Sequence, residues 1–444
     1  MYQSRGFTLV STLLLSAASA LAQSAAIDGE VFTGQHVPKD ATVFITRAWP
    51  REGLAYCCPS CCRDCTRSAR TDAQGKWRIS GLDNALTFDL LVIADGCSPQ
   101  VIPHVDPAKH LSIIVPMAPR DLALFSPERI VRGRIIDAAG KPVLRAEVSP
   151  QLLWNPDFRG GRNSPVDGLD PVAITDADGR FQLTCASPCA GMDLSVEARG
   201  FSQVCKRRVR SGETQTTIEL HEGATISGQL TLAGRPLPNV DLQLCDVDRG
   251  GSGPNCFQRI EIGTNDKGRF EFVNLRAPGE YILCATMDSA SKLGCIPQTR
   301  VQVGADGQIV ELPPFAVAPG RLIAGRVIVP AGKTLPPDAR VTLSANEAWD
   351  AASHPLAPDG RFEFANVPDG KFALSLDAPG LWISPRNASF NPSGKQLVGR
   401  VDRDTPDLLI ELTDQEPARP GAPARSPDKE LGGDDHSQAK ETTP

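Results

Sequence analysis

The sequence predicts an all-β protein, a tandem array of four antiparallel β-sandwich domains, and recurring motifs and composition support this prediction. A short turn followed by an alternating strand occurs four times at intervals of about 100 residues, the length of one small β-sandwich. The 444 residues include 39 Gly and 38 Pro. This usage is above average and typical of turn-rich β proteins.

The first motif is a tight turn rich in Asp and Asn that ends in Gly. Glycine supplies the positive φ that such turns need. The glycines are Gly75, Gly179, Gly268 and Gly360. Apolar and polar residues then alternate, which predicts a strand with one buried face. We expect one aromatic residue of each copy to fill an equivalent core position: Trp77, Phe181, Phe270 and Phe362.

A second motif, apolar-x-Gly-x-apolar, opens each copy. It occupies residues 27–31, 131–135, 226–230 and 323–327. Its alternation predicts a strand, and we expect the glycine to lie on the face opposite the apolar residues. An Ala-x-Gly turn follows later in three copies, at 94–96, 198–200 and 378–380. Strands at such short spacing with turns between them indicate a sandwich.

In this order the motifs resemble the carboxypeptidase regulatory-like, or transthyretin-like (prealbumin-like), domain repeat of secreted bacterial proteins. The resemblance covers residues 26–413. It implies extracellular, Ig-like/transthyretin-like sandwiches of seven antiparallel strands that are usually non-catalytic. A related bacterial surface module forms Lys–Asn isopeptide bonds from a lysine in the opening strand. That chemistry is not carried over, because the opening strands here hold Glu30, Arg134, Gln229 and Arg326.

The N-terminus predicts a secretory signal peptide. Arg5 precedes the apolar run Phe7 to Leu15, and Ala20 to Ala22 forms a small-x-small cleavage site. A prepilin-like leader is the alternative, because the residues from Arg5 resemble such a cleavage site. No later apolar run approaches the roughly 20 residues of a membrane span. The expected location is therefore secreted, periplasmic or on the cell surface.

The motif positions predict the domain boundaries. We expect a signal peptide at 1–22, sandwiches at 23–123, 124–221, 222–316 and 317–413, and a tail at 414–444. The tail is polar and rich in Pro, so it cannot bury enough apolar surface to offset the entropy of ordering. We predict that it is disordered.

Composition and motifs restrict the function classes. The net charge of −6 argues against a nucleic-acid partner. The sequence contains no HExxH, GxSxG, Walker or dinucleotide glycine motif. We therefore predict a protein that is not an enzyme and that has no cofactor and no metal.

Thirteen cysteines are the most unusual feature of the composition. They are Cys57, Cys58, Cys61, Cys62, Cys65, Cys97, Cys185, Cys189, Cys205, Cys245, Cys256, Cys284 and Cys295. Disulfides are the expected state in an exported protein. The segment 57–65 carries two CxxC pairs in tandem, for which a metal centre and redox exchange are the alternatives. In the third copy the candidate pairs are Cys245–Cys256 and Cys284–Cys295.

Three tryptophans follow an early strand in three of the copies: Trp49, Trp154 and Trp349. Exposed aromatics at the end of a sandwich could stack on sugar rings, whereas buried ones would only cap their own core. The sequence therefore predicts a secreted, non-enzymatic binding or structural protein whose partner is a polysaccharide or an extracellular protein. Carbohydrate binding through these tryptophans is the alternative, followed by a hydrolase or a thiol or metal protein at the 57–65 loop.

Overall fold

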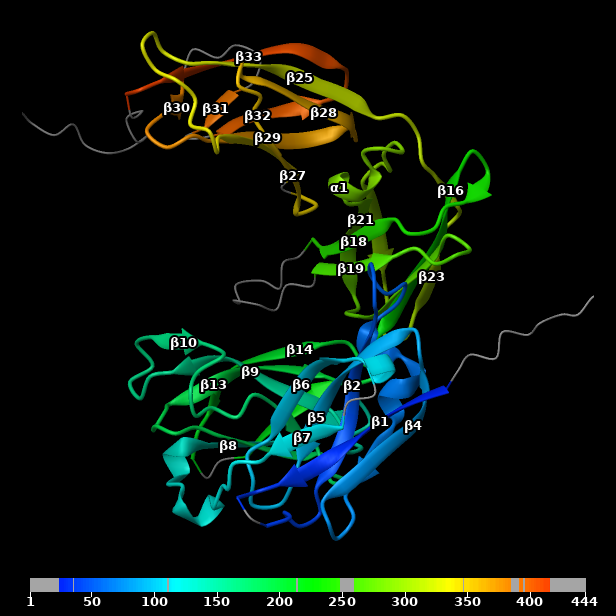
Figure 1. Cartoon of the computed structure of the whole chain (residues 1–444), viewed down its shortest axis with the longest axis vertical. Helices are drawn as coiled ribbons and strands as arrows, with labels where there is room; N and C mark the ends of the chain where they lie inside the picture. Colours follow the sequence, from blue (N-terminus) through cyan, green and yellow to red (C-terminus); the bar gives the residue numbers. More distant parts are fainter. Residues whose placement is uncertain are drawn as a thin grey trace, which may run out of the picture. The chain divides into compact units, whose positions relative to one another are not determined.

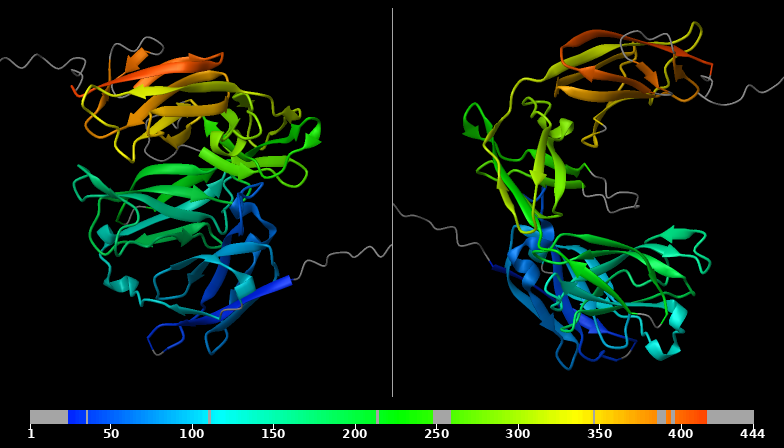
Figure 2. Two further views of the ribbon diagram at one scale, coloured as in Figure 1. Left: turned by 45° about the horizontal axis from the view of Figure 1, so that its top comes forward. Right: turned by 180° about the vertical axis from the view of Figure 1, so that it is seen from behind.

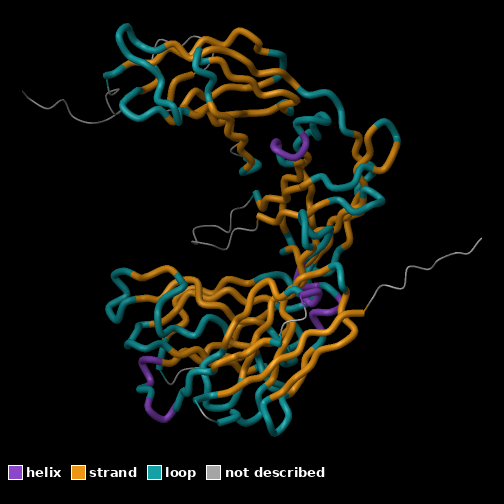
Figure 3. The backbone as a smooth tube through the Cα atoms, in the orientation of Figure 1, coloured by secondary structure: helices purple, strands orange, loops and turns teal. Residues whose placement is uncertain are grey.

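The computed structural model describes residues 24–34, 36–109, 112–212, 215–247, 259–345, 347–384, 391–393 and 396–415 (Figure 1). The predicted signal peptide, Cys256 and all but the first two residues of the predicted tail lie outside these ranges. Strands and loops make up nearly all of the described chain (Figure 3). None of its helices is long and apolar enough to cross a membrane. The predicted all-β fold class is confirmed.

The described residues form eight sheets, which pair into four sandwiches. They also form two compact units. The first unit runs to Arg321 and includes 345–351 and 365–370, and the second holds the remainder of the fourth sandwich.

The first sandwich has a three-stranded and a four-stranded sheet. The smaller sheet has the order β4 (Lys76–Asp83), β1 (Ser24–Phe32), β7 (Ile113–Pro116). The larger has the order β3 (Ser68–Arg70), β2 (Thr42–Pro50), β5 (Leu86–Ile93), β6 (Gln100–Val105). Between β2 and β3 lie two 3-10 turns, η1 (Pro59–Cys61) and η2 (Arg63–Thr66).

The second sandwich repeats this plan. One sheet has the order β12 (Arg180–Thr184), β8 (Ile130–Asp137), β15 (Gln215–Leu220). The other has the order β10 (Gly161–Asn163), β9 (Glu147–Trp154), β13 (Gly191–Glu197), β14 (Val204–Arg210), with β11 (Ala173–Ile174) also paired to β9.

In the third sandwich, β16 (Ala224–Leu232) pairs with β17 (Arg235–Pro236), β20 (Arg269–Leu275), β23 (Ile309–Glu311) and β24 (Phe315–Ala316). The facing sheet has the order β19 (Arg259–Gly263), β18 (Asp241–Asp246), β21 (Gly279–Ala285), β22 (Thr299–Val303). The short helix α1 (Met287–Ala290) follows β21.

The fourth sandwich also has two sheets. One has the order β28 (Arg361–Val367), β25 (Arg321–Ile328), β33 (Thr405–Thr413), β30 (Trp382–Ile383). The other has the order β27 (Asp350–Pro355), β26 (Arg340–Ala345), β29 (Gly370–Asp377), β32 (Gln396–Val401), β31 (Asn391–Ser393). The remaining 3-10 turns are η3 (Pro107–Lys109), η4 (Leu122–Leu124) and η5 (Pro127–Arg129).

Each sandwich departs from the expected antiparallel pattern at its opening strand, with one parallel pairing in the first, second and fourth sandwiches and two in the third. The opening strand pairs antiparallel on one side but in parallel with a closing strand on the other, as β1 does with β7 and β8 does with β15. The parallel pair brings the start and the end of each module together in one sheet. Each repeat therefore closes on itself along the chain.

The motif glycine of each opening strand lies on the buried face, so the expectation that it faces away from the apolar residues is wrong. Gly29 shares its face with Ile27 and Val31, because residues two apart on a strand point the same way. Gly29 pairs directly with Trp77, and Gly133 pairs with Phe181. The glycine leaves room for the aromatic ring of the neighbouring strand.

The four aromatic residues do fill equivalent core positions, as predicted. Trp77, Phe181, Phe270 and Phe362 are each 2–6% exposed. The turns before them are also as expected, with φ of 81° at Gly75. In the second copy, Asp176 accepts hydrogen bonds from the backbone N–H groups of Asp178 and Arg180, which fixes the turn.

Replacing Gly133 with alanine should destabilise the second sandwich. The added Cβ would meet the Phe181 ring and lie 2.7 Å from the backbone oxygen of Thr216. We expect a loss of about 1–3 kcal/mol in the free energy of unfolding, the usual cost of overpacking. Hydrogen exchange of peptides from β8 and β12 would localise the loss.

The matched control is Gly304→Ala. A Cβ there would meet only the side-chain oxygen of Gln308, at 3.4 Å, so we expect a change within about 0.5 kcal/mol. Equal exchange in the two variants would contradict the packing role of Gly133.

Candidate functional site

The candidate site is formed by residues 51–67, named the Cys loop here, which connect β2 to β3 in the first sandwich. Its two CxxC sequences each span one 3-10 turn. Cys58 precedes η1 and Cys62 precedes η2. The N–H of Cys61 donates to the oxygen of Cys58, and that of Cys65 to the oxygen of Cys62, each at 3.1 Å. This turn geometry places the two cysteines of each pair close together.

The Cys loop leaves its own sandwich and pairs with the third one (Figure 2). The oxygen of Ala55 accepts a hydrogen bond from the N–H of Gly263 at 2.9 Å, and that of Tyr56 from Glu271 at 3.1 Å. Gly263 and Glu271 lie on β19 and β20, which are edge strands of the two facing sheets. Edge strands carry unpaired backbone groups, and the Cys loop satisfies some of them.

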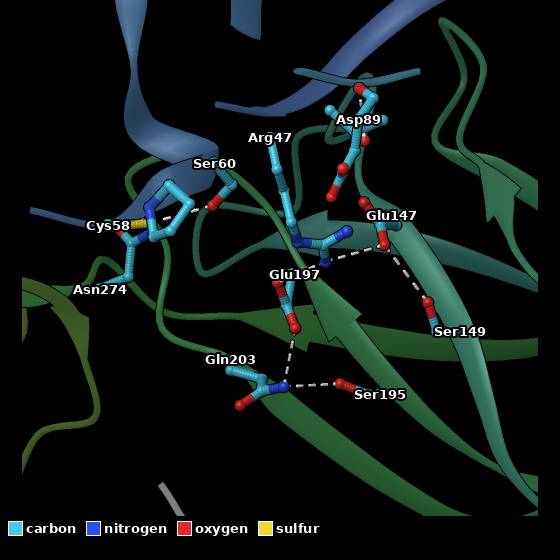
Figure 4. A network of polar contacts seen from close by, with 12 residues as sticks. Arg47, Cys58, Ser60, Asp89, Glu147, Ser149, Ser195, Glu197, Gln203 and Asn274 are labelled. Atoms are coloured by element: carbon cyan, nitrogen blue, oxygen red, sulfur yellow. Dashed lines mark hydrogen bonds and ion pairs between the residues drawn. The ribbon is translucent and has the colours of Figure 1, made fainter. Parts of the chain in front are cut away.

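The first CxxC pair has direct sulfur contacts. The thiol of Cys61 donates to the Sγ of Cys58 at 2.9 Å. Ser60 Oγ lies 3.0 Å from the same sulfur (Figure 4). Asn274 of the third sandwich donates through Nδ2 to Cys61 Sγ at 3.2 Å. Cys58 therefore has two hydrogen-bond partners that favour its thiolate.

These contacts separate the pKa values of the loop thiols. The hydrogen bond from Cys61, helped by Ser60, lowers the pKa of Cys58 to about 6 although burial opposes it. The hydrogen bond from Cys65 lowers the pKa of Cys62 to about 6 in the same way. Burial instead raises the pKa of Cys57 to about 11. Thiols of one short loop thus differ in reactivity, since the thiolate is the nucleophile.

A cluster of charges joins the first two sandwiches beside the Cys loop (Figure 4). Arg47 Nη2 lies 3.0 Å from Glu147 Oε1 and 3.4 Å from Glu197 Oε2. Gln203 Nε2 donates to Glu197 Oε1 at 2.9 Å and to Ser195 Oγ at 2.7 Å. Burial raises the pKa of Glu197 although Arg47 favours its charged form.

Two small pockets flank the Cys loop. The first, of about 240 Å³, is lined by residues that include Cys65, Arg145 and Phe201. The second, of about 210 Å³, is lined by residues that include Cys58 and Asn274. Both are below the usual size of a site for a drug-sized ligand, so they suit small groups or single side chains.

Trp49 and Trp154 are held by a buried or half-buried carboxylate in their own sandwich. Trp49 Nε1 donates to Asp89 Oδ2 at 3.0 Å, and Trp154 Nε1 donates to Asp193 Oδ1 at 2.7 Å. The two aspartates occupy equivalent places, on β5 and β13. Each indole is therefore fixed in orientation by a hydrogen bond.

The same aspartates also fix a residue that covers the indole. Asp89 accepts from the backbone N–H of His104 at 2.8 Å, and Asp193 from that of Arg208 at 2.7 Å. The His104 ring lies 6.2 Å from that of Trp49, and the Arg208 guanidinium lies 4.8 Å over Trp154. Part of each indole is thus already in contact within the protein.

Trp349 differs from these two. It is 45% exposed and has a φ of +54° in the turn after β26. The three candidate tryptophans belong to three different sandwiches. Among the described residues they have no common pocket.

No disulfide joins any two of the twelve cysteines in the described part of the chain. Those outside the Cys loop are mostly buried: Cys97, Cys185, Cys189, Cys245, Cys284 and Cys295. Cys205 lies on β14. The described ranges hold no group of three or more His, Cys, Asp or Glu that could bind a metal ion.

Several residues of the site were not predicted from the sequence. Arg47, Glu147, Glu197 and Asn274 meet only because separate sandwiches pack together, and no short motif marks them. Asp89 and Asp193 could have been found by aligning the repeats, because each follows its tryptophan at nearly the same distance, 40 and 39 residues.

No family model and no curated protein matches this sequence. Solved structures that align with it include the Bacillus anthracis TIE protein, at 10% identity and a TM-score of 0.18 over 88% of this chain and 74% of that one. The minor pilin GBS52 of Streptococcus agalactiae aligns at 15% identity and a TM-score of 0.23, over 46% and 99%. BcpA, the major pilin subunit of Bacillus cereus, aligns at 10% identity and a TM-score of 0.18, over 65% and 99%.

Replacing Arg47 with glutamine should weaken the junction of the first two sandwiches. Glu147 and Glu197 would then face each other without a cation, and we expect a loss of about 1–2 kcal/mol in the free energy of unfolding at pH 7. The loss should become smaller as the pH falls through the raised pKa of Glu197, because a protonated Glu197 no longer repels Glu147. Urea unfolding at several pH values would measure it.

Arg78→Gln provides the control, since Arg78 pairs with Asp28 at 3.1 Å on the exposed surface of the same sandwich. We expect a change of less than about 0.5 kcal/mol. A loss in Arg47→Gln that does not vary with pH would exclude the charge mechanism.

Proposed function

We propose that this chain is a structural and binding protein of the cell exterior, in which the first three β-sandwich modules are held as a fixed array. The observation that carries the proposal is the backbone pairing of Ala55 and Tyr56 with Gly263 and Glu271. These bonds link the first and third modules, which are not adjacent in sequence.

The charge cluster supports the same function. Arg47, Glu147 and Glu197 link the first and second modules, so polar groups that could serve a ligand instead connect modules. The placement outside the cytoplasm rests on the predicted signal peptide. The module boundaries at 23–123, 124–221, 222–316 and 317–413 are part of this proposal.

Structural disulfides among the buried cysteines are also part of the proposal. An oxidising compartment would favour them, and buried thiols such as Cys185 and Cys189 lie in the core of the second sandwich.

The fixed array can be tested with Gly263→Val. The new side chain would meet the backbone oxygen of Leu54, which lies 2.8 Å from an ideal Cβ, and should push the Cys loop off the edge of β19. We expect the backbone N–H groups of Gly263 and Glu271 to exchange with solvent at least about tenfold faster, because their hydrogen bonds to the Cys loop would be lost. Hydrogen exchange measured by NMR would resolve these two amides.

Gly304→Val is the control, because its site is open apart from Gln308. Exchange in β18 and β21 should be the same in both variants, which would show that the third sandwich stays folded. If Gly263→Val leaves both amides as protected as in the wild type, the Cys loop does not hold the array together.

Carbohydrate binding is the second candidate function, and the exposure of Trp349 favours it. An exposed indole can stack on a sugar ring, whereas Trp49 and Trp154 already contact His104 and Arg208. Variants of those two would also lose a hydrogen bond to a half-buried or buried aspartate, so their binding results would be confounded by lost stability.

Trp349→Ala is therefore the informative variant for this function. If the chain binds polysaccharide through Trp349, we expect retention on insoluble polysaccharide to fall at least about tenfold, the loss expected for one stacking aromatic. Affinity electrophoresis would measure it. Leu409→Ala, another exposed apolar residue of the fourth sandwich, should bind like the wild type. If the wild type and both variants are retained equally, or if none of them is retained, Trp349 has no role in binding polysaccharide.

A further inference from the structure

The two thiols of the first CxxC pair differ in access as well as in hydrogen bonding. Cys58 lines the pocket of about 210 Å³ together with Ser60, Gln203 and Asn274, whereas Cys61 is not among its lining residues. The Sγ of Cys61 lies 2.9 Å from the Sγ of Cys58. One thiol can therefore meet a ligand in the pocket, and the second is in reach of the first.

We propose that Cys58 and Cys61 form a thiol–disulfide exchange site that takes a disulfide from a small molecule or from an exposed protein segment. Cys58 is the attacking thiol and Cys61 the resolving thiol. This adds a reactive site to a structural protein and rests on the packing of the first three modules proposed above, because Gln203 and Asn274 line the pocket from the second and third modules.

The polar groups around the pair suit these roles. Ser60 Oγ and the Cys61 thiol both contact Cys58 Sγ, at 3.0 and 2.9 Å, and hydrogen bonds of this kind stabilise a thiolate. The lowered pKa of Cys58 agrees with this geometry. Asn274 Nδ2 donates to Cys61 Sγ at 3.2 Å and lies 4.0 Å from Cys58 Sγ, so it can stabilise negative charge as it forms on Cys61.

The exchange proceeds in two steps. The Cys58 thiolate attacks the RS sulfur of R–S–S–R′, so that an S–S bond forms between Cys58 Sγ and this sulfur, the S–S bond of the substrate breaks, and R′S⁻ takes the proton that Cys61 releases. The Cys61 thiolate then attacks Cys58 Sγ, and RS⁻ leaves and takes a proton from water. The dithiol loses two electrons to the substrate, and the products are two substrate thiols and a Cys58–Cys61 disulfide.

The reaction is stoichiometric in this direction. A substrate dithiol that attacks the Cys58–Cys61 disulfide reverses both steps and restores the thiols. The neighbouring thiol Cys57 does not fit this role, because burial raises its pKa and it does not line the pocket.

Alkylation of the reduced full chain tests the attacking role. The protein would be exposed briefly to iodoacetamide between pH 4.5 and 8, and the modified cysteines mapped by mass spectrometry. We expect Cys58 to react at least about tenfold faster than Cys57 at pH 7, with half of its maximal rate near pH 6. Because this measurement uses the wild-type protein, it does not depend on the folding of a variant. Slower reaction of Cys58 than of Cys57 would overturn the proposal.

Exchange with two disulfides tests the full cycle. Hydroxyethyl disulfide serves as the small molecule and insulin as the protein disulfide. We expect the wild type to form one Cys58–Cys61 disulfide per chain, and Cys61→Ser to retain a mixed disulfide on Cys58. Reaction with hydroxyethyl disulfide alone would assign a small-molecule source, and reaction with insulin a protein source. If neither reagent gives the mixed disulfide in a folded Cys61→Ser protein, the proposal is wrong.

Cys57→Ser is the matched control, because it removes a thiol of the same loop outside the pair. It should react like the wild type with both reagents, whereas Cys58→Ser should form no mixed disulfide within this pair. Circular dichroism of each variant would establish that the sandwiches remain folded.

Discussion

The contact between a strand glycine and an aromatic ring is the constraint on which the sandwiches depend. In the first module Gly29 pairs across the sheet with Trp77, and in the second Gly133 pairs with Phe181. A side chain at the glycine would occupy the space of the ring and approach the backbone of the parallel closing strand. The glycine thus permits both the close strand pairing and the large core residue.

This constraint links the two motifs that the sequence repeats. The opening strand supplies the glycine, and the strand after the turn supplies the aromatic. In the first three copies the glycine lies against the aromatic ring, and in the fourth the atoms nearest to a Cβ at Gly325 belong to Leu408 of the closing strand. The parallel pairing of first and last strands then closes each module, so that a four-module chain can be built from self-contained units.

The Cys loop adds contacts of another kind. It takes the place of a neighbouring strand on β19 and β20 of the third module, and Arg47 balances two glutamates of the second. Backbone hydrogen bonds and a half-buried ion pair therefore contribute to holding these modules together. The loop can therefore combine a structural role with reactive thiols.

The sequence by itself determined the fold class, the four modules and the aromatic core positions, because these depend on local turns and alternation that each repeat carries. The sequence also places Gly29 on the face of Ile27 and Val31, because residues two apart on a strand point the same way, so the prediction of the opposite face was wrong. It identified the tandem CxxC pairs but could not tell Cys58 from Cys57. Only the tertiary structure brought Asn274 to the sulfur of Cys61 and Arg47 to Glu147 and Glu197. Those contacts join residues far apart in the chain, and no local pattern encodes them.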